Sequence, residues 1–250
     1  MFNKNNKIIK FYIVIGIAVL ILIASLVVFN SNYIFSLKKV YVSGNDNISF
    51  DSILSMSGLE YAKPLTWINS EKIRKRLLIN PFIKQVNVKV LYPDAIKILI
   101  KERKPFASLK LNNVYYIIDK EAIVLRKKDK LYEKNELLRI KISGIDYDKY
   151  DCNQKIHIPE LNEMINSITY TNEIYPIIND IHYINLIVLP VNKAEVYLKF
   201  NKINTTFHFM YGHMDSGSLV KAYKIYKNLV NNDNDKVESV IMNNVIIGKY

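Results

Sequence analysis

The residue types that most often carry catalysis or bind metals are sparse in this 250-residue chain. His208 and His213 lie close in sequence, but no cysteine or acidic residue accompanies them at the spacing of a zinc site. The run GHMDSGS from Gly212 to Ser218 suggests a nucleophile or phosphate loop, yet it has neither the G-x-S-x-G nor the Walker spacing. We interpret it as a connector from a strand to a helix, with Ser218 near the helix cap.

The remaining polar clusters are no more specific. Asp146, Asp148 and Asp151 could bind calcium, but they lack the spacing and the terminal Glu of an EF-hand loop. Cys152 is the only cysteine, which excludes an internal disulfide, and we expect it to be an unreactive small residue. No nucleophile, base and oxyanion site come together. The sequence therefore predicts a protein that is not an enzyme and has no metal or cofactor.

The net charge of the chain is large and positive, but its distribution does not indicate binding to nucleic acid. The formal net charge is +12, with 35 basic residues, but the lysines are scattered and few of the basic residues are arginines. One basic cluster occurs, at Lys72, Arg74, Lys75 and Arg76, and we interpret it as a solvated face near the end of a helix, with a partner surface as the alternative. A weak attraction to anionic lipid or cell-wall polymer is the interaction that this composition leaves open.

One apolar segment near the N-terminus predicts a membrane anchor. Phe11–Phe29 is uncharged, and as a helix it would span roughly 28 Å, close to the thickness of a bilayer core. A cleaved signal peptide is the alternative, but its apolar region would be shorter and a small-x-small cleavage site would follow. Lys4, Lys7 and Lys10 precede the span, so we expect residues 1–10 in the cytoplasm and the body outside. Two lysines soon after the span weaken this asymmetry.

Residues 37–104 have the pattern of a β-α-α-β-β unit. Leu37–Ser43 alternates apolar and polar positions, as a half-buried strand does. Ser49 can cap a first helix that Gly58 ends, and Asn69 can cap a second. Two alternating strands follow, joined by a turn at Tyr92–Ala95.

Residues 105–250 have the texture of a mainly antiparallel β domain with flanking helices, which makes the fold class of the body α+β. The segments we expect are strands at 106–111, 114–118, 123–125, 181–189, 194–200 and 205–211, and helices at 159–168 and 219–230. The last segment, 237–247, could be one continuous edge strand or two short strands around Asn243-Asn244.

Five phrases behind the anchor together resemble the FtsQ/DivIB family of bacterial cell-division proteins. They are VYVSGN at 40–45, ILSMSGL at 53–59, NPFIKQV at 80–86, YPD at 92–94 and KERKPFA at 101–107. The resemblance implies a tail (1–10), a transmembrane helix (11–29), a POTRA domain (37–104) and a β domain (105–250). It fades after Asp119: Ala122 stands where the family commonly has Gly, LLRIKISG at 137–144 lacks the family's proline, and IMN at 241–243 replaces an acidic-and-Arg pair.

The resemblance also implies a function at the division septum. Such proteins are non-enzymatic scaffolds that hold small bitopic coiled-coil partners, similar to FtsB/DivIC and FtsL, and link them to septal wall synthesis. The expected mode is addition of a partner strand to an open sheet edge. The residues expected to bind the partner are Val240, Ile241, Met242, Asn243, Asn244, Val245 and Ile246, with Tyr223 and Tyr226 on the preceding helix. A POTRA-bearing envelope or secretion scaffold outside division, and a membrane-anchored hydrolase, are the alternatives.

Overall fold

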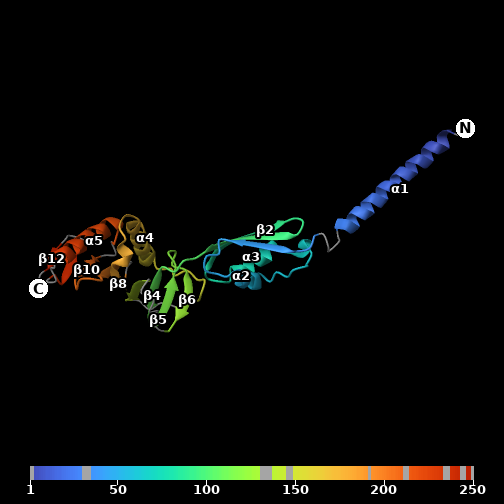
Figure 1. The fold of residues 1–250 in the computed structure, drawn as a ribbon. Helices are drawn as coiled ribbons and strands as arrows, with labels where there is room; N and C mark the ends of the chain where they lie inside the picture. Colours follow the sequence, from blue (N-terminus) through green and yellow to red (C-terminus); the bar gives the residue numbers. More distant parts are fainter. Residues whose placement is uncertain are drawn as a thin grey trace. The chain divides into compact units, whose positions relative to one another are not determined.

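The structure is a computed structural model, which describes residues 3–29, 35–129, 137–144, 149–190, 193–210, 214–232, 237–242 and 246–248. The chain divides into two compact units, Met1–Glu102 and Arg103–Tyr250, whose ribbons are drawn in Figure 1. The sequence predicts this boundary slightly later, between Lys104 and Pro105.

Arg103, the first residue of the second unit, forms ion pairs within that unit. Its Nη1 donates to the carboxylates of Asp119 (2.6 Å) and Glu121 (2.9 Å), and the Arg103–Asp119 pair is largely buried. Asp119 in turn accepts the N–H groups of Glu121 and Ile123 and so shapes the turn after its strand. A fragment of the second unit that lacks Arg103 would leave this carboxylate without its guanidinium partner.

Helix α1 (Asn3–Phe29) contains the apolar segment that the sequence singles out. From Ile9 to Val27 every side chain is exposed, and this stretch is long and apolar enough to cross a membrane. In water such a helix would leave a continuous apolar surface unburied, which is unfavourable by about 25 cal/mol for each Å². The helix therefore indicates a single-pass membrane anchor.

The first unit beyond the anchor has the predicted β-α-α-β-β order. Its elements are β1 (Lys39–Ser43), α2 (Phe50–Ser57), a 3-10 turn η1 (Leu65–Trp67), α3 (Ser70–Leu77), β2 (Ile83–Leu91) and β3 (Ala95–Glu102). β3 lies in the centre of the sheet, parallel to β1 and antiparallel to β2. Ile96, Ile98 and Ile100 on β3 share one core with Ile53 of α2 and Ile73 of α3. The residues between them on β3 face water, which explains the alternation in the sequence.

The helix ends of this unit are built by the predicted residues. The Ser49 side chain accepts the N–H of Ser52 at the start of α2, and the Asn69 side chain accepts the N–H of Lys72 at the start of α3. Gly58 ends α2 in the left-handed region, with φ of 64°. Local sequence therefore sets these three boundaries.

The second unit is one nine-stranded sheet with two main helices. Its elements are β4 (Ala107–Leu111), β5 (Val114–Ile118), β6 (Val124–Lys128), β7 (Leu138–Ser143), α4 (Pro159–Ile174), η2 (Ile177–Asn179), β8 (Ile181–Leu189), β9 (Lys193–Phe200), β10 (Thr206–Phe209), α5 (Ser216–Asn231), β11 (Ser239–Ile241) and β12 (Ile246–Gly248). The strand order is β12-β11-β10-β9-β8-β7-β4-β5-β6. Five of the eight pairings are antiparallel, and β4–β7, β7–β8 and β10–β11 are parallel.

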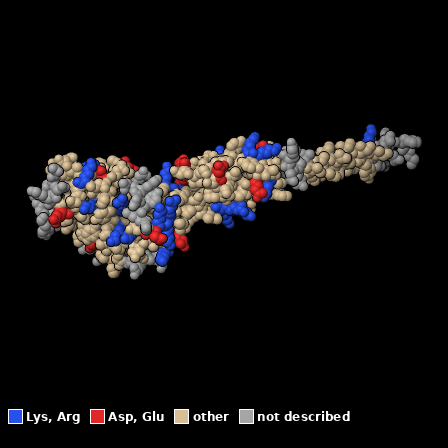
Figure 2. Space-filling view, turned by 60° about the horizontal axis from the view of Figure 1, so that its bottom comes forward, with Lys and Arg blue, Asp and Glu red and all other residues tan. Residues whose placement is uncertain are grey.

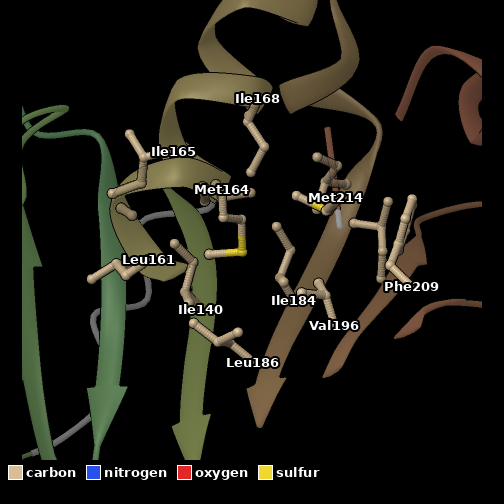
Figure 3. Close-up of a cluster of buried hydrophobic side chains, with 14 of the residues drawn as sticks. Ile140, Leu161, Met164, Ile165, Ile168, Ile184, Leu186, Val196, Phe209 and Met214 are labelled. Atoms are coloured by element: carbon tan, nitrogen blue, oxygen red, sulfur yellow. The ribbon is translucent and has the colours of Figure 1, made fainter. Parts of the chain in front are cut away.

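Buried apolar side chains of α4 hold that helix against the sheet. Figure 3 shows side chains from α4 meeting side chains from β7, β8 and β9: Leu161, Met164, Ile165, Ile168, Ile140, Ile184, Leu186 and Val196. Each contributes about 1.5–3 kcal/mol when it is removed from water. This packing makes the sheet a rigid support for the strands at its C-terminal end.

One strand of the second unit differs from the sequence-based expectations. β7 is not among the predicted strands, although it lies between β4 and β8 and joins the two halves of the sheet. Ser218 lies near the cap of α5, as predicted: the cap is Asp215, whose side chain accepts the N–H of Ser218. Ala122, where the family commonly has Gly, takes the left-handed conformation with φ of 59° and is fully buried.

Candidate functional site

The C-terminal segment forms two short strands. β11 pairs in parallel with β10 on one side and antiparallel with β12 on the other. Of the two arrangements that the sequence leaves open, the structure has two strands, while Asn243, Asn244 and Val245 lie outside the described residues. Within the part of the chain that the structure describes, β12 is the last strand at this end of the sheet (Figure 1).

The backbone of β11 is used on both sides. Thr206 donates its N–H to the carbonyl of Glu238 (3.0 Å), and Met242 donates its N–H to the carbonyl of His208 (2.9 Å). Because alternate residues of a strand point to the same side, position 240 also faces β10, and position 241 faces β12. Val240, Ile241 and Met242, which the sequence assigns to the partner site, thus lie on or beside a strand that is paired on both sides, and such a strand has no row of free backbone groups to offer a partner strand.

The open backbone groups belong to β12. Ile246 is opposite Ile241 and Gly248 is opposite Ser239 in the register. Both face β11, so the N–H and C=O of Ile247 point to the other side of β12. Among the described residues no strand covers that side. Ile246, which the sequence assigns to the partner site, lies on β12, and its backbone N–H and C=O face β11.

The side chains of β11 divide between the two faces of the sheet. Val240 and Met242 are buried in the main core, whereas Ile241 is half-buried on the opposite face, next to His208 in the register. The Thr205 hydroxyl, itself buried, donates to the carbonyl of Val237 (2.5 Å) and joins the segment before β10 to the segment before β11. Val240 and Met242 thus anchor β11 and the residue after it to the main core through their side chains.

The two tyrosines expected to touch a partner lie in the core instead. Tyr226 is fully buried and stacks on Phe200 of β9, with ring centroids 4.3 Å apart. Phe200 in turn packs edge-to-face against Phe207 of β10 at 5.2 Å. The side of α5 that carries Tyr223 and Tyr226 faces the sheet. Both rings contact Phe200, which in turn contacts Phe207 of β10, the strand next to β11.

Tyr223 and Lys227 of α5 form a polar clamp with Asp180, the residue before β8. The Tyr223 hydroxyl donates to the Asp180 carboxylate (2.7 Å), and Lys227 Nζ donates to the same oxygen (2.8 Å). Lys227 also lies 4.9 Å from the centre of the Tyr223 ring. Burial acts to raise the pKa of Asp180, but the bonds from Lys227 and Tyr223 outweigh it, and the pKa lies below its ordinary value. Burial and the bond to Asp180 raise the pKa of Tyr223.

A second polar cluster lies on the outer face of the sheet, beside Ile241. The Tyr197 hydroxyl donates to the Glu195 carboxylate (2.8 Å), and its ring stacks on His208 at 4.3 Å. His208 Nε2 lies 3.5 Å from the same carboxylate. Burial, followed by the bond to Glu195, raises the pKa of Tyr197. The alternation of polar residues in β9 and β10 was the available signal for this cluster, which sequence reasoning missed.

Where the structure describes them, the other residues considered for chemistry do not assemble a site. His213, Asp146 and Asp148 lie outside the described residues, and Asp151 and Cys152 are exposed. Within the described ranges no group of three His, Cys, Asp or Glu residues could hold a metal ion. On the face shown in Figure 2, Lys and Arg side chains lie in small separate groups among acidic and uncharged residues.

Comparison with known proteins matches the first unit to a domain family and larger parts of the chain to cell division proteins. Residues 35–103 match the POTRA domain of FtsQ type. The chain is 28% identical over 136 residues to the cell division protein DivIB of Clostridium acetobutylicum, covering 54% of this chain and 53% of that protein. It is 30% identical to DivIB of Clostridium tetani over 49% of this chain and 45% of that protein. It is 28% identical to the cell division protein FtsQ of Rickettsia bellii over 76% and 72%. The chain thus matches about half the length of the first two relatives.

Proposed function

We propose that this chain is a member of the FtsQ/DivIB family of bacterial cell-division proteins and acts as a non-enzymatic membrane scaffold of the division septum. Its POTRA and β domains would lie outside the cytoplasm, and α1 would hold them to the membrane. The partners would be short bitopic coiled-coil proteins similar to FtsB/DivIC and FtsL, which the scaffold links to septal wall synthesis.

The observation that supports this role is the open edge of β12. An added partner strand would pair with the outward N–H and C=O of Ile247, and each backbone hydrogen bond contributes about 0.5–1.5 kcal/mol. The sheet behind this strand is rigid, because β11 is bonded on both sides and Val240 is buried under it. A preformed edge lowers the ordering cost of binding.

Two adjacent proline substitutions test the edge. Ile247→Pro removes the outward N–H, so we expect the protein to stay folded and to lose capture of its FtsB/DivIC-like and FtsL-like partners. Ile247→Ala keeps the N–H and should retain capture. Ile246→Pro removes a donor that faces β11, so it should lower the melting temperature of the β domain.

The measurement is co-purification of the partners from dividing cells, together with a thermal melt of each variant. A folded Ile247→Pro protein that captures its partners as well as the natural chain would refute strand addition at β12.

The orientation of the chain in the membrane has its own test: protease added outside the cytoplasmic membrane should digest the body and leave only a small anchored fragment. Protection of the body would contradict the expected orientation, which follows from Lys4, Lys7 and Lys10.

A further inference from the structure

Three of the exposed aromatic side chains of the POTRA domain lie on segments close to its first residues. Trp67 is 75% exposed, Tyr92 is 62% exposed and Tyr61 is 50% exposed. Trp67 is also the only tryptophan of the protein. Trp and Tyr have an apolar body and a polar tip, and they are enriched where one side is apolar and the other wet. Trp67, the most exposed of the three, is therefore suited to a boundary between an apolar phase and water.

Backbone bonds place these residues at the end of the domain that the anchor enters. Leu65 donates its N–H to the carbonyl of Phe35 (2.8 Å), and Leu37 donates to the carbonyl of Lys63 (2.9 Å). The segment that carries Tyr61 and Trp67 is thus paired with the first residues of the domain. The Phe35 ring also meets the Tyr92 ring edge-on at 6.1 Å. We call the residues 35–39, 60–67 and 91–94 the anchor-proximal end.

The anchor-proximal end cannot be far from the membrane surface. Helix α1 ends at Phe29, and Phe35 is the first described residue of the domain. Six Cα–Cα steps separate them, which bounds their separation at about 20 Å for a fully extended chain. The headgroup layer itself is several Å thick, so contact between this end and the lipid surface needs no stretching of the chain.

A basic groove opens beside Trp67. It has a volume of about 360 Å³, and its lining includes Lys63, Trp67, Lys72 and Arg76 together with one acidic residue, Glu60. Arg76 donates to the carbonyl of Ser57 and is held in the domain. Lys63 pairs with the exposed Glu60 at 2.8 Å, and Lys72 forms no ion pair with any described residue. The groove therefore presents ammonium groups next to an exposed indole.

We propose that the anchor-proximal end of the POTRA domain lies on the surface of the membrane that holds α1, with Trp67 at headgroup level and Lys63 and Lys72 over anionic headgroups. Trp and Tyr belong at this level of a bilayer, and each lysine near an anionic surface strengthens the attraction. Because the anchor keeps the domain close to the membrane, the effective concentration of the lipid surface is high, and weak interactions with it are enough for docking. Docking would fix the direction in which the POTRA domain leaves the membrane. The inference rests on retention of the anchor and not on strand addition at β12.

The single tryptophan makes the contact measurable in the full-length chain. The protein is reconstituted in vesicles of phosphatidylcholine and phosphatidylglycerol, with and without brominated acyl chains, and its tryptophan emission and quenching by acrylamide are recorded. We expect quenching of Trp67 by the brominated lipid, together with protection from acrylamide relative to the same chain in detergent. Raising the salt from 0.1 M to 1 M should weaken both, since the Debye length falls from about 10 Å to about 3 Å.

A matched variant moves the probe to the other end of α3. Ile79 is also 75% exposed and follows α3, whereas Trp67 precedes it. The double variant Trp67→Phe, Ile79→Trp should remain accessible to acrylamide and unquenched by brominated lipid. Equal lipid quenching of the two probes would refute a specific docked end.

Two lysine variants test the charge. Replacing Lys63 and Lys72 by Gln should weaken docking about 25-fold in the equilibrium constant, from about fivefold for each lysine. Lys101→Gln, an exposed lysine at the far end of β3, should have no effect. If Trp67 stays as accessible in anionic vesicles as in detergent, the proposal fails. It also fails if Trp67 becomes protected only when a partner protein is added, because the surface would then bind protein. Capture of partners at β12 is scored separately and does not depend on either outcome.

Discussion

Removal of the Tyr223 hydroxyl should weaken the clamp that holds α5, without disturbing the core around its ring. Tyr223→Phe deletes the donor that lies 2.7 Å from the Asp180 carboxylate. A hydrogen bond to a charged group contributes about 1.5–3 kcal/mol when it is well buried. Asp180 keeps Lys227 as a partner, and 20% of its side chain is exposed, so water can replace part of the loss. We therefore expect a loss of about 1–1.5 kcal/mol in the free energy of unfolding at pH 7.

The effect should depend on pH in a direction set by two shifted groups. The folded pKa of Asp180 lies below its unfolded value, so its contribution is present above about pH 4 and is lost as the pH falls through the folded pKa. The folded pKa of Tyr223 lies above its unfolded value, so its contribution is present below about pH 10 and is lost as the pH rises further. The difference between the natural chain and Tyr223→Phe should thus be largest between these limits.

The assay is urea unfolding of residues 35–250, followed by far-ultraviolet circular dichroism at pH 7 and at pH 3. With a slope of about 2 kcal/mol per M, the expected loss moves the midpoint of the β domain by about 0.5 M at pH 7 and by less at pH 3. Tyr183→Phe, on the outer face of the sheet, is the control and should change the midpoint little. A shift of equal size at both pH values, or no shift at pH 7, would refute the view that a charged clamp holds α5.

Four further predictions concern the division into units, two glycines and a helix end. A Cβ at Gly44, where φ is +81°, would lie 2.0 Å from the carbonyl oxygen of Ile100, so Gly44→Ala should destabilise the POTRA domain by about 2–3 kcal/mol, read by Trp67 fluorescence. A Cβ at Gly144, where φ is +106°, would lie 2.1 Å from the Val188 carbonyl oxygen, so Gly144→Ala should instead lower the unfolding midpoint of the β domain. A shift of both midpoints by either change would show that the units do not unfold independently. Asn69→Ala should cost about 1 kcal/mol, measured by urea unfolding, because the N–H of Lys72 loses its acceptor, and an unchanged midpoint would mean that water replaces the cap. The fragment 35–102 should give a mixed α/β spectrum and unfold cooperatively, whereas a random-coil spectrum would place part of its core in the second unit.

Local chemistry in the sequence determined much of the POTRA domain. Ser49, Gly58 and Asn69 act on neighbours within a few residues, so their roles as caps can be predicted without knowledge of the rest of the fold. The same holds for alternation along β3, since one face of a strand must be buried and the other is wet. The resemblance to the FtsQ/DivIB family was also visible in short phrases in order, and residues 35–103 match the POTRA domain of FtsQ type.

Long-range pairing was decided only by the tertiary structure. Leu138, Ile140 and Ile142 alternate with polar residues, yet nothing local says that this strand lies between β4 and β8 as the link across the sheet. Ala122 accepts a left-handed conformation because Asp119 closes the turn around it, a constraint that depends on several backbone bonds at once.

The candidate partner site shows the same limit most clearly. An apolar segment with turn residues in its middle predicts strands, but not which of them ends the sheet, because that depends on pairing with β10, distant along the chain. The amphipathic pattern of α5 likewise placed Tyr223 and Tyr226 on a helix without saying whether their side faces solvent or sheet. Burial against Phe200 decides this, since a helix turns its apolar side to whatever the rest of the chain packs beneath it.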